Sequence, residues 1–180
     1  MNNEQDLLTR LQSESNREQA FRELMSLYKE RLYWHIRKIV ISHDDADDVL
    51  QNTFIKVYKN INGFKGDSKL FSWMYRIATN ESITYLNQKA KRNQMTSEEV
   101  QAYTVNNLRA DTYFDGDEIQ IKLQKAVAAL PQKQQLVFNM KYFDDLKYKD
   151  ISEILETSEG ALKASYHLAV KKIESYLIQD

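Results

Sequence analysis

Apolar residues recur at three- and four-residue intervals through the first half of the chain, which is the spacing of amphipathic α-helices. The pattern predicts one helix over 15–41, a second over 46–61 and a third over about 70–91. The clearest turn in the chain lies between the last two, at 62–68, where the sequence reads "NGFKGDS".

Two helix starts carry capping signals. Ser15 and Glu18 have the spacing of a capping box, which predicts the start of the first helix. Asp44 or Asp45 can cap the second helix, directly after the break in the apolar pattern.

The helical pattern returns in the last third of the chain. It predicts a helix over 119–130 and another with Pro131 in its first turn. A short helix carrying Ile151, Ile154 and Leu155 follows, and the last helix runs to about residue 178.

Residues 93–118 show no sustained period, and they hold most of the acidic excess of a chain whose net charge is only −1. We therefore interpret this stretch as a flexible acidic linker. With 4 glycines and 1 proline in 180 residues, the composition favours an all-α fold. The expected architecture is two small helical domains, 1–92 and 119–180, joined by the linker.

Composition excludes several function classes. There is no cysteine, so disulfides and thiolate metal sites are ruled out, and the 3 histidines are not clustered. The sequence contains neither a glycine-rich phosphate loop nor a Ser/His/Asp set, so we expect no enzyme, no catalytic residue, no metal and no cofactor. The polar N-terminus lacks the apolar core of a signal peptide, and no apolar run reaches the length of a membrane span. A cytoplasmic location is the expectation.

The C-terminal pattern of a short helix, a three-residue turn and a longer helix is typical of a helix-turn-helix. Thr157 or Ser158 would cap the last helix. Opposite its apolar stripe lies a face that combines small residues with long polar ones, which suits contact with a DNA groove. This face comprises Glu159, Gly160, Lys163, Ala164, His167 and Lys171, with Lys172 beside them.

The third predicted helix carries a second candidate site. Trp73, Arg76, Ile77 and Asn80 cluster on one side at helical spacing, and the loop at 64–68 lies just upstream. Aromatic rings and guanidinium planes stack on unpaired bases, and an amide can read a base edge. The competing interpretation is that Trp73 is simply a core residue.

Two stretches of the chain resemble a known family. One stretch of the chain resembles region 2 of bacterial sigma factors: "DADDVLQNTFIKVYKNINGFKGDSKLFSWMYRIATNESITYLNQKAKR". Another resembles region 4: "LQKAVAALPQKQQLVFNMKYFDDLKYKDISEILETSEGALKASYHLAVKKIESYL". The short linker between them resembles the extracytoplasmic-function (ECF) group of the sigma-70 family. The resemblance implies a factor that binds core RNA polymerase, carries it to promoter DNA and opens the duplex.

The resemblance assigns residues to three surfaces. The first is the region-2 surface that meets the −10 element and melts it, and it comprises Lys56, Phe64, Trp73, Arg76, Ile77, Asn80, Lys89, Lys91 and Arg92. Within this surface, a flipped base would be held beside Phe64, Ile77 and Asn80. The region-4 surface that reads the −35 element comprises Ser158, Gly160, Lys163, Ala164, His167, Lys171 and Lys172. The surface that grips core polymerase comprises Asp48, Gln51, Asn52 and Ile55.

The chain departs from the family pattern at four positions where relatives often carry arginine. These are Gln135, Ser165, Leu168 and Val170. Fewer cations predict fewer phosphate contacts in region 4 and a shallower salt dependence of its DNA binding.

Two other classes of function compete with a sigma factor. One is a free-standing helix-turn-helix regulator that binds duplex DNA as a dimer without polymerase. The other is a helical interaction protein that binds no DNA. The resemblance also implies an anti-sigma protein as a partner, because ECF factors are commonly held by one.

Overall fold

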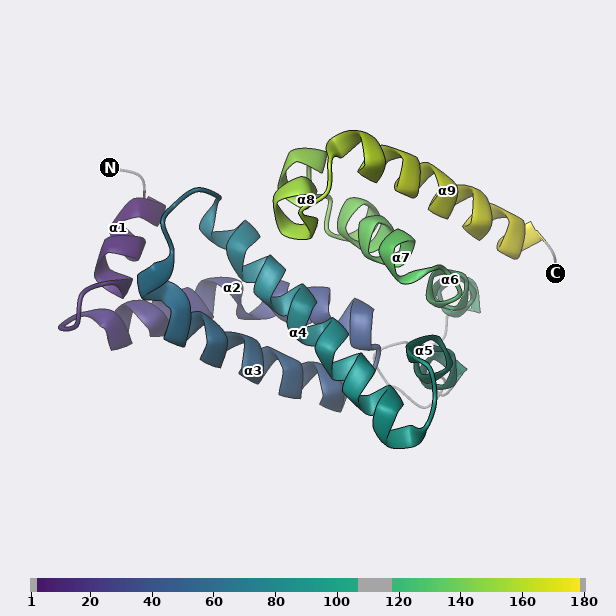
Figure 1. The fold of residues 1–180 in the computed structure, drawn as a ribbon, viewed down its shortest axis with the longest axis horizontal. Coiled ribbons are helices and arrows are strands. Elements are labelled where there is room, and N and C mark those ends of the chain that lie inside the picture. The colour runs from purple at the N-terminus through teal and green to yellow at the C-terminus, as the bar shows by residue number, and fades with distance from the viewer. Residues whose placement is uncertain (1–2, 107–117, 179–180) are drawn as a thin grey trace.

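The computed structural model describes residues 3–106 and 118–178, and every regular element in these ranges is helical (Figure 1). The all-α prediction is therefore confirmed. The helices are α1 (Asn3–Leu11), α2 (Arg17–Val40), α3 (His43–Asn60), α4 (Leu70–Asn93), α5 (Ser97–Asn106), α6 (Glu118–Ala128), α7 (Gln132–Phe138), α8 (Tyr148–Leu155) and α9 (Glu159–Ile178). A 3-10 turn, Ile61–Gly63, follows α3, and a π-helical turn, Asn139–Phe143, follows α7.

Helices α2, α3 and α4 form the bundle of the first half, and α1 lies against its end (Figure 1). The apolar stripe of each helix is buried in the shared core, as with Leu32 in α2, Val57 in α3 and Met74 in α4. Burial of this apolar surface is the main stabilising contribution to the bundle.

The second half packs α6, α7 and α9 around a smaller core that includes Val127, Phe138 and Ile173. Helix α8 then meets α9 across the turn 156–158, in which Glu156 takes a left-handed conformation with φ of 50°. The Ser158 hydroxyl accepts a hydrogen bond from the Ala161 N–H at 3.4 Å, which satisfies a free donor at the start of α9. The predicted helix-turn-helix is present.

Two predicted caps differ from the structure. Helix α2 begins at Arg17 after Asn16, whose side chain makes no capping bond, and the Ser15 hydroxyl instead faces Ser13 at 3.2 Å. Helix α3 is capped by Ser42, which accepts from the Asp45 N–H at 3.4 Å, so neither predicted aspartate is the cap. Ser42 has the extended backbone that a cap requires, with φ of −76° and ψ of 139°, whereas Asn16 keeps a helical backbone and caps nothing.

Part of the predicted flexible linker is an ordered helix. Thr96 and Glu99 form a reciprocal capping box at the start of α5: the Glu99 N–H donates to the Thr96 hydroxyl at 3.2 Å, and the Thr96 N–H donates to the Glu99 carboxylate at 2.6 Å. Val100 on this helix is buried. The remainder of the predicted linker, 107–117, lies outside the described residues.

The two halves pack against each other, and α8 lies along α4 (Figure 1). Their apolar residues join one cluster, in which Ile151 and Ile154 of α8 accompany Met74 of α4. Burial at this boundary holds the second half onto the first.

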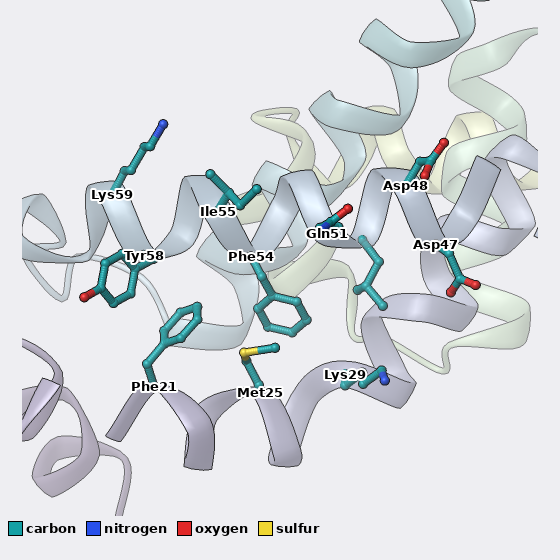
Figure 2. Close-up of a pocket in the computed structure, with 11 residues that line it drawn as sticks. Phe21, Met25, Lys29, Asp47, Asp48, Gln51, Phe54, Ile55, Tyr58 and Lys59 are labelled. Atoms are coloured by element: carbon teal, nitrogen blue, oxygen red, sulfur yellow. The ribbon is translucent and has the colours of Figure 1, made fainter. Parts of the chain in front are cut away.

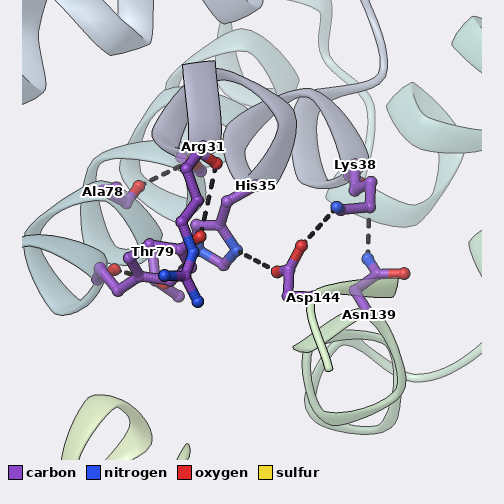
Figure 3. A network of polar contacts seen from close by, with 9 residues as sticks. Arg31, His35, Lys38, Ala78, Thr79, Asn139 and Asp144 are labelled. Atoms are coloured by element: carbon purple, nitrogen blue, oxygen red, sulfur yellow. Dashed lines mark hydrogen bonds and ion pairs between the residues drawn. The ribbon is translucent and has the colours of Figure 1, made fainter. Parts of the chain in front are cut away.

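Polar contacts surround this boundary (Figure 3). Asp144 accepts a hydrogen bond from His35 at 3.2 Å and pairs with Lys38 at 2.5 Å, so the carboxylate ties the end of the π-turn to α2. The other His35 ring nitrogen lies 2.8 Å from the Thr79 hydroxyl of α4. Elsewhere at the boundary, Gln101 of α5 donates to the Ile39 carbonyl at 3.1 Å.

The pKa of Asp144 lies below its ordinary value. Burial acts to raise the pKa, but the hydrogen bond with His35 and the fields of His35 and Lys38 outweigh burial. A carboxylate with a lowered pKa stabilises the fold above its unfolded pKa, and this stabilisation is lost as the pH falls through the folded value.

We therefore predict that Asp144→Asn lowers the free energy of unfolding at pH 7 by about 2 kcal/mol, because it removes a charged acceptor from two donors. The variant should also lose stability less steeply than the wild type when the pH falls below about 4. Chemical denaturation at several pH values measures both effects. Asp145→Asn is the matched control, since Asp145 is exposed; equal stability of the two variants at pH 7 would contradict the prediction.

Candidate nucleic-acid and polymerase interfaces

The predicted −10 surface lies on α4 and on the loop before it, with Lys56 contributed by α3. Phe64 is buried, and its ring packs against Trp73 with 5.1 Å between centroids. Trp73 and Ile77 are half-buried, whereas Asn80 is exposed. The structure thus places a ring, an aliphatic side chain and an exposed amide along one side of a single helix.

Three of the predicted −10 cations pair with carboxylates. Arg76 lies 3.0 Å from Glu156, which belongs to the turn between α8 and α9. Lys56 pairs with Glu81 of α4. The third, Lys89, pairs with Asp45. Lys91 and Arg92, at the end of α4, form no such pair with the described residues and are exposed.

Lys89 is the third paired cation, and it takes part in a small polar cluster. Asp45 at the start of α3 accepts from the Tyr85 hydroxyl at 2.6 Å and from Lys89 at 2.5 Å. Burial and then the hydrogen bond to Asp45 raise the pKa of Tyr85 to about 12. Lys89 therefore ties α4 to α3 in this structure, and DNA would have to compete with Asp45 for it.

The predicted −35 residues share one exposed face of α9 and the turn before it. Lys163 also lies 5.7 Å from the Tyr148 ring centroid, a cation–π contact that orients its stem. The residues, all exposed, are Ser158, Gly160, Lys163, Ala164, His167, Lys171 and Lys172.

The four positions that lack the family's arginine fall into different environments. Gln135 is buried and accepts a hydrogen bond from Gln101 at 3.0 Å, so it faces the linker helix and not a DNA surface. Ser165 and Val170 are half-buried. Leu168 is exposed and lies beside Lys171, Lys172 and Tyr176 at the edge of a shallow hollow.

The predicted polymerase-binding residues line the outer side of α3. Asp48, Gln51 and Ile55 border a groove of about 550 Å³ between α2 and α3, and Asn52 is exposed nearby (Figure 2). Ile55 keeps 45% of its surface exposed and borders the apolar lining of this groove, so the two together form an apolar patch that a partner can cover.

Sequence reasoning missed the groove's apolar floor. Phe21 and Met25 of α2 face Phe54 and Tyr58 of α3 across it, and Phe21 packs edge-on against Tyr58 at 5.0 Å. The sequence did hold a signal for this floor, because Phe21 and Met25 extend the apolar pattern of α2 beyond the residues that are buried in the core. A groove with an apolar floor and acids at one end suits an amphipathic helix from a partner.

Within residues 3–106 and 118–178, none of the helices combines the length and the apolar character that a membrane span requires. Within the same ranges, no group of three His, Asp or Glu side chains is placed to hold a metal ion.

Comparison with known families matches both halves. The family described as Sigma-70 region 2 matches residues 24–92, and the family described as Sigma-70, region 4 matches residues 120–173. The ECF RNA polymerase sigma factor SigW of Bacillus subtilis is 30% identical over 156 residues, covering 82% of this chain and 83% of that protein. The RNA polymerase sigma-H factor of Pseudomonas aeruginosa is 26% identical and covers 97% of this chain and 93% of its own length.

Solved structures share the fold over nearly the whole chain. CnrH in complex with the cytosolic domain of CnrY is similar with a TM-score of 0.72 at 18% identity, covering 98% of each chain. The sigma factor RpoE of Bartonella quintana, in complex with the anti-sigma factor NepR, is similar with a TM-score of 0.67 at 18% identity, covering 89% of this chain and 98% of that one.

The chain therefore belongs to the sigma-70 family of RNA polymerase sigma factors. Within that family it is a member of the ECF group, whose proteins serve promoter-specific initiation of transcription and are not enzymes.

The contrast between Lys89 and Lys91 gives a prediction. In the holoenzyme bound to duplex promoter, Lys91→Gln should reduce the slope of log affinity against log salt by about 0.9, because one phosphate contact is lost. Lys89→Gln should change the slope less, because Lys89 already neutralises Asp45. Filter binding or fluorescence anisotropy at several salt concentrations measures both slopes; a larger loss for Lys89→Gln would contradict the prediction.

Proposed function

We propose that this chain binds core RNA polymerase through the α2–α3 groove, reads the −35 element as duplex with α9, and opens the −10 element with a flipped base held at α4. The observation that carries the proposal is the side of α4 on which Trp73, Ile77 and Asn80 are grouped, next to the loop that ends at Lys69. Stacking on such rings contributes about 1–3 kcal/mol per base, which can offset the cost of extruding a base.

A free-standing helix-turn-helix regulator is a weaker candidate. It would use the exposed face of α9, but it would leave the α2–α3 groove and the aromatic side of α4 without a role. A helical protein that binds no DNA would also leave the lysines of α9 unexplained.

The packed arrangement of the two halves has to change when promoter is bound. Arg76 is a proposed DNA contact, but here it faces Glu156 of the other half. A partly exposed ion pair of this kind contributes about 1 kcal/mol or less, so binding to polymerase can readily replace it. Polymerase would then hold both halves on one duplex, and the short connection between them raises the effective concentration of the second half.

An anti-sigma protein is the proposed regulator. Two proteins of similar fold were solved in complexes, one with the cytosolic domain of CnrY and one with NepR. The α2–α3 groove, with its exposed Ile55, offers such an inhibitor a surface that polymerase would also need.

The direct test mixes the chain with core polymerase and a library of random promoter fragments, and sequences the transcripts. Transcripts from defined start points that require both components are the expected result. Specific duplex binding without polymerase would favour the free-standing regulator instead.

We predict that Asn80→Ala and Trp73→Ala reduce open-complex formation at the selected promoter by roughly tenfold or more, because base contacts contribute about 1–3 kcal/mol each. Affinity for core polymerase should stay within about twofold. Permanganate footprinting measures opening, and competition against labelled wild type measures core binding. Loss of core binding would show that these two side chains are structural.

A second prediction concerns the groove. Ile55→Asp should weaken association with core polymerase by roughly a hundredfold, since it places a charge in an apolar contact. Leu27→Asp is the control, because Leu27 is also exposed but lies on a side of α2 that does not line the groove. Fluorescence anisotropy with labelled factor measures both; equal affinities for the two variants would refute the proposed polymerase site.

A further inference from the structure

Helix α1 lies outside the part of the chain that matches Sigma-70 region 2, yet it is firmly part of the bundle. Leu7, Leu8 and Leu11 are buried in the main core. Arg10 also pairs with Glu23 of α2 at 2.8 Å. The helix is therefore fixed relative to α2, and it lies at the end of the bundle where the chain passes from α3 to α4 (Figure 1).

Gln12, directly after α1, holds the beginning of the loop that leads to α4. Its side-chain Nε2 donates to the Ile61 carbonyl at 3.2 Å and to the Phe64 carbonyl at 3.1 Å. An amide nitrogen carries two hydrogens, so both bonds can form at once. The two carbonyls lie at either end of the 3-10 turn, so a single side chain fixes the turn and the backbone of Phe64.

Glu4 holds the end of the same loop. Its carboxylate accepts a hydrogen bond from the Leu70 N–H at 2.9 Å, at the first residue of α4. Lys69, the residue before the helix, makes no side-chain capping bond. The first N–H groups of a helix need acceptors, and a carboxylate there also interacts favourably with the helix dipole. Glu4 therefore caps α4 from a distant part of the chain.

The loop between these two anchors carries the residue that meets the proposed base pocket. Phe64 packs on Trp73 of α4, and the anchors act on the backbone at both sides of this contact. A pocket that keeps one shape before the base arrives discriminates better between bases, because less of the binding energy is spent on ordering it.

We infer that α1 and Gln12 position the promoter-reading loop, and that Gln12 is a specificity-determining residue for the −10 element. The role is one of positioning: Gln12 acts through the carbonyls of Ile61 and Phe64 and does not itself contact the base. This inference rests on the proposed function of α4, and it adds a residue outside the matched region to the promoter-reading machinery.

The test compares Gln12→Glu with Gln5→Glu in the full-length chain. The first change keeps the shape of the side chain but replaces its donor with an acceptor, whereas Gln5 is exposed on α1 and serves as a control of equal charge. Each variant is assembled with core polymerase. Binding is measured to single-stranded −10 oligonucleotides of the promoter that wild type selects, with each of the four bases at the flipped position.

The expected result for Gln12→Glu is a roughly tenfold fall in discrimination between the preferred base and the other three, from the loss of two hydrogen bonds. Core binding should match that of Gln5→Glu, whereas the melting temperature should be lower, because the same two hydrogen bonds are lost from the folded chain. In the free chain, hydrogen exchange of the Phe64 amide should accelerate roughly tenfold, because that N–H donates to the same Ile61 carbonyl.

Base discrimination in Gln12→Glu equal to that in Gln5→Glu would overturn the inference. So would a loss of core binding as large as the loss of discrimination, since that pattern marks a merely structural residue. A wild-type chain that selects no promoter with polymerase would instead refute the proposed function, and the exchange rate of the Phe64 amide would still report whether Gln12 holds the loop.

Discussion

Helix α4 packs against α2, α3, α5 and α8 at once, and the rest of the structure depends on this constraint. Met74 and Ala78 on its buried side complete the bundle with α2 and α3. Another side receives α8, which brings Ile151 and Ile154 into the same apolar cluster. The side that remains carries the ring, the aliphatic side chain and the amide that we assign to the −10 element. Arg76, which we also propose as a DNA contact on this helix, faces Glu156 of the second half, so on this proposal docking of that half competes with DNA for Arg76.

The contacts at the boundary fix the position of the second half on the first, yet several of them are weak enough for a partner to replace. Asp144 is nearly buried and accepts from two donors, so it fixes how the π-turn sits on α2. Gln101 and Gln135 add a neutral amide contact through α5. Arg76 and Glu156, by contrast, form a partly exposed pair that solvent screens. A partner that binds both halves separately needs to displace only modest interactions at each point, which agrees with our proposal that polymerase separates the halves.

Sequence periodicity predicted the long helices and the helix-turn-helix because each has a continuous apolar stripe. It missed α1 and α5, although the spacing of Leu7, Leu8 and Leu11 and the Thr96–Glu99 capping box were readable signals. The docking of the halves could not have been predicted in this way. Contacts such as that between His35 and Asp144 join residues 109 positions apart, and local pattern carries no information on such pairs.

The same limit applies to the sites. The face of α9 follows from helical geometry alone, so its residues could be named in advance. The pairing of Lys89 with Asp45 and the burial of Gln135 depend on tertiary packing, which turns apparent surface positions into internal ones. The floor of the α2–α3 groove was hidden for a related reason: apolar residues in a stripe all look like core until the partner helix is placed.

The central claim is that the free chain keeps its halves packed across α4 and that core polymerase separates them. The chain has no cysteine, so Gln5→Cys and Glu174→Cys allow a spin-label pair between α1 and α9 without interference. Double electron–electron resonance should show one narrow distance for the free chain and a clearly different one with core polymerase. An unchanged distance with polymerase, or a broad distribution for the free chain, would contradict the account.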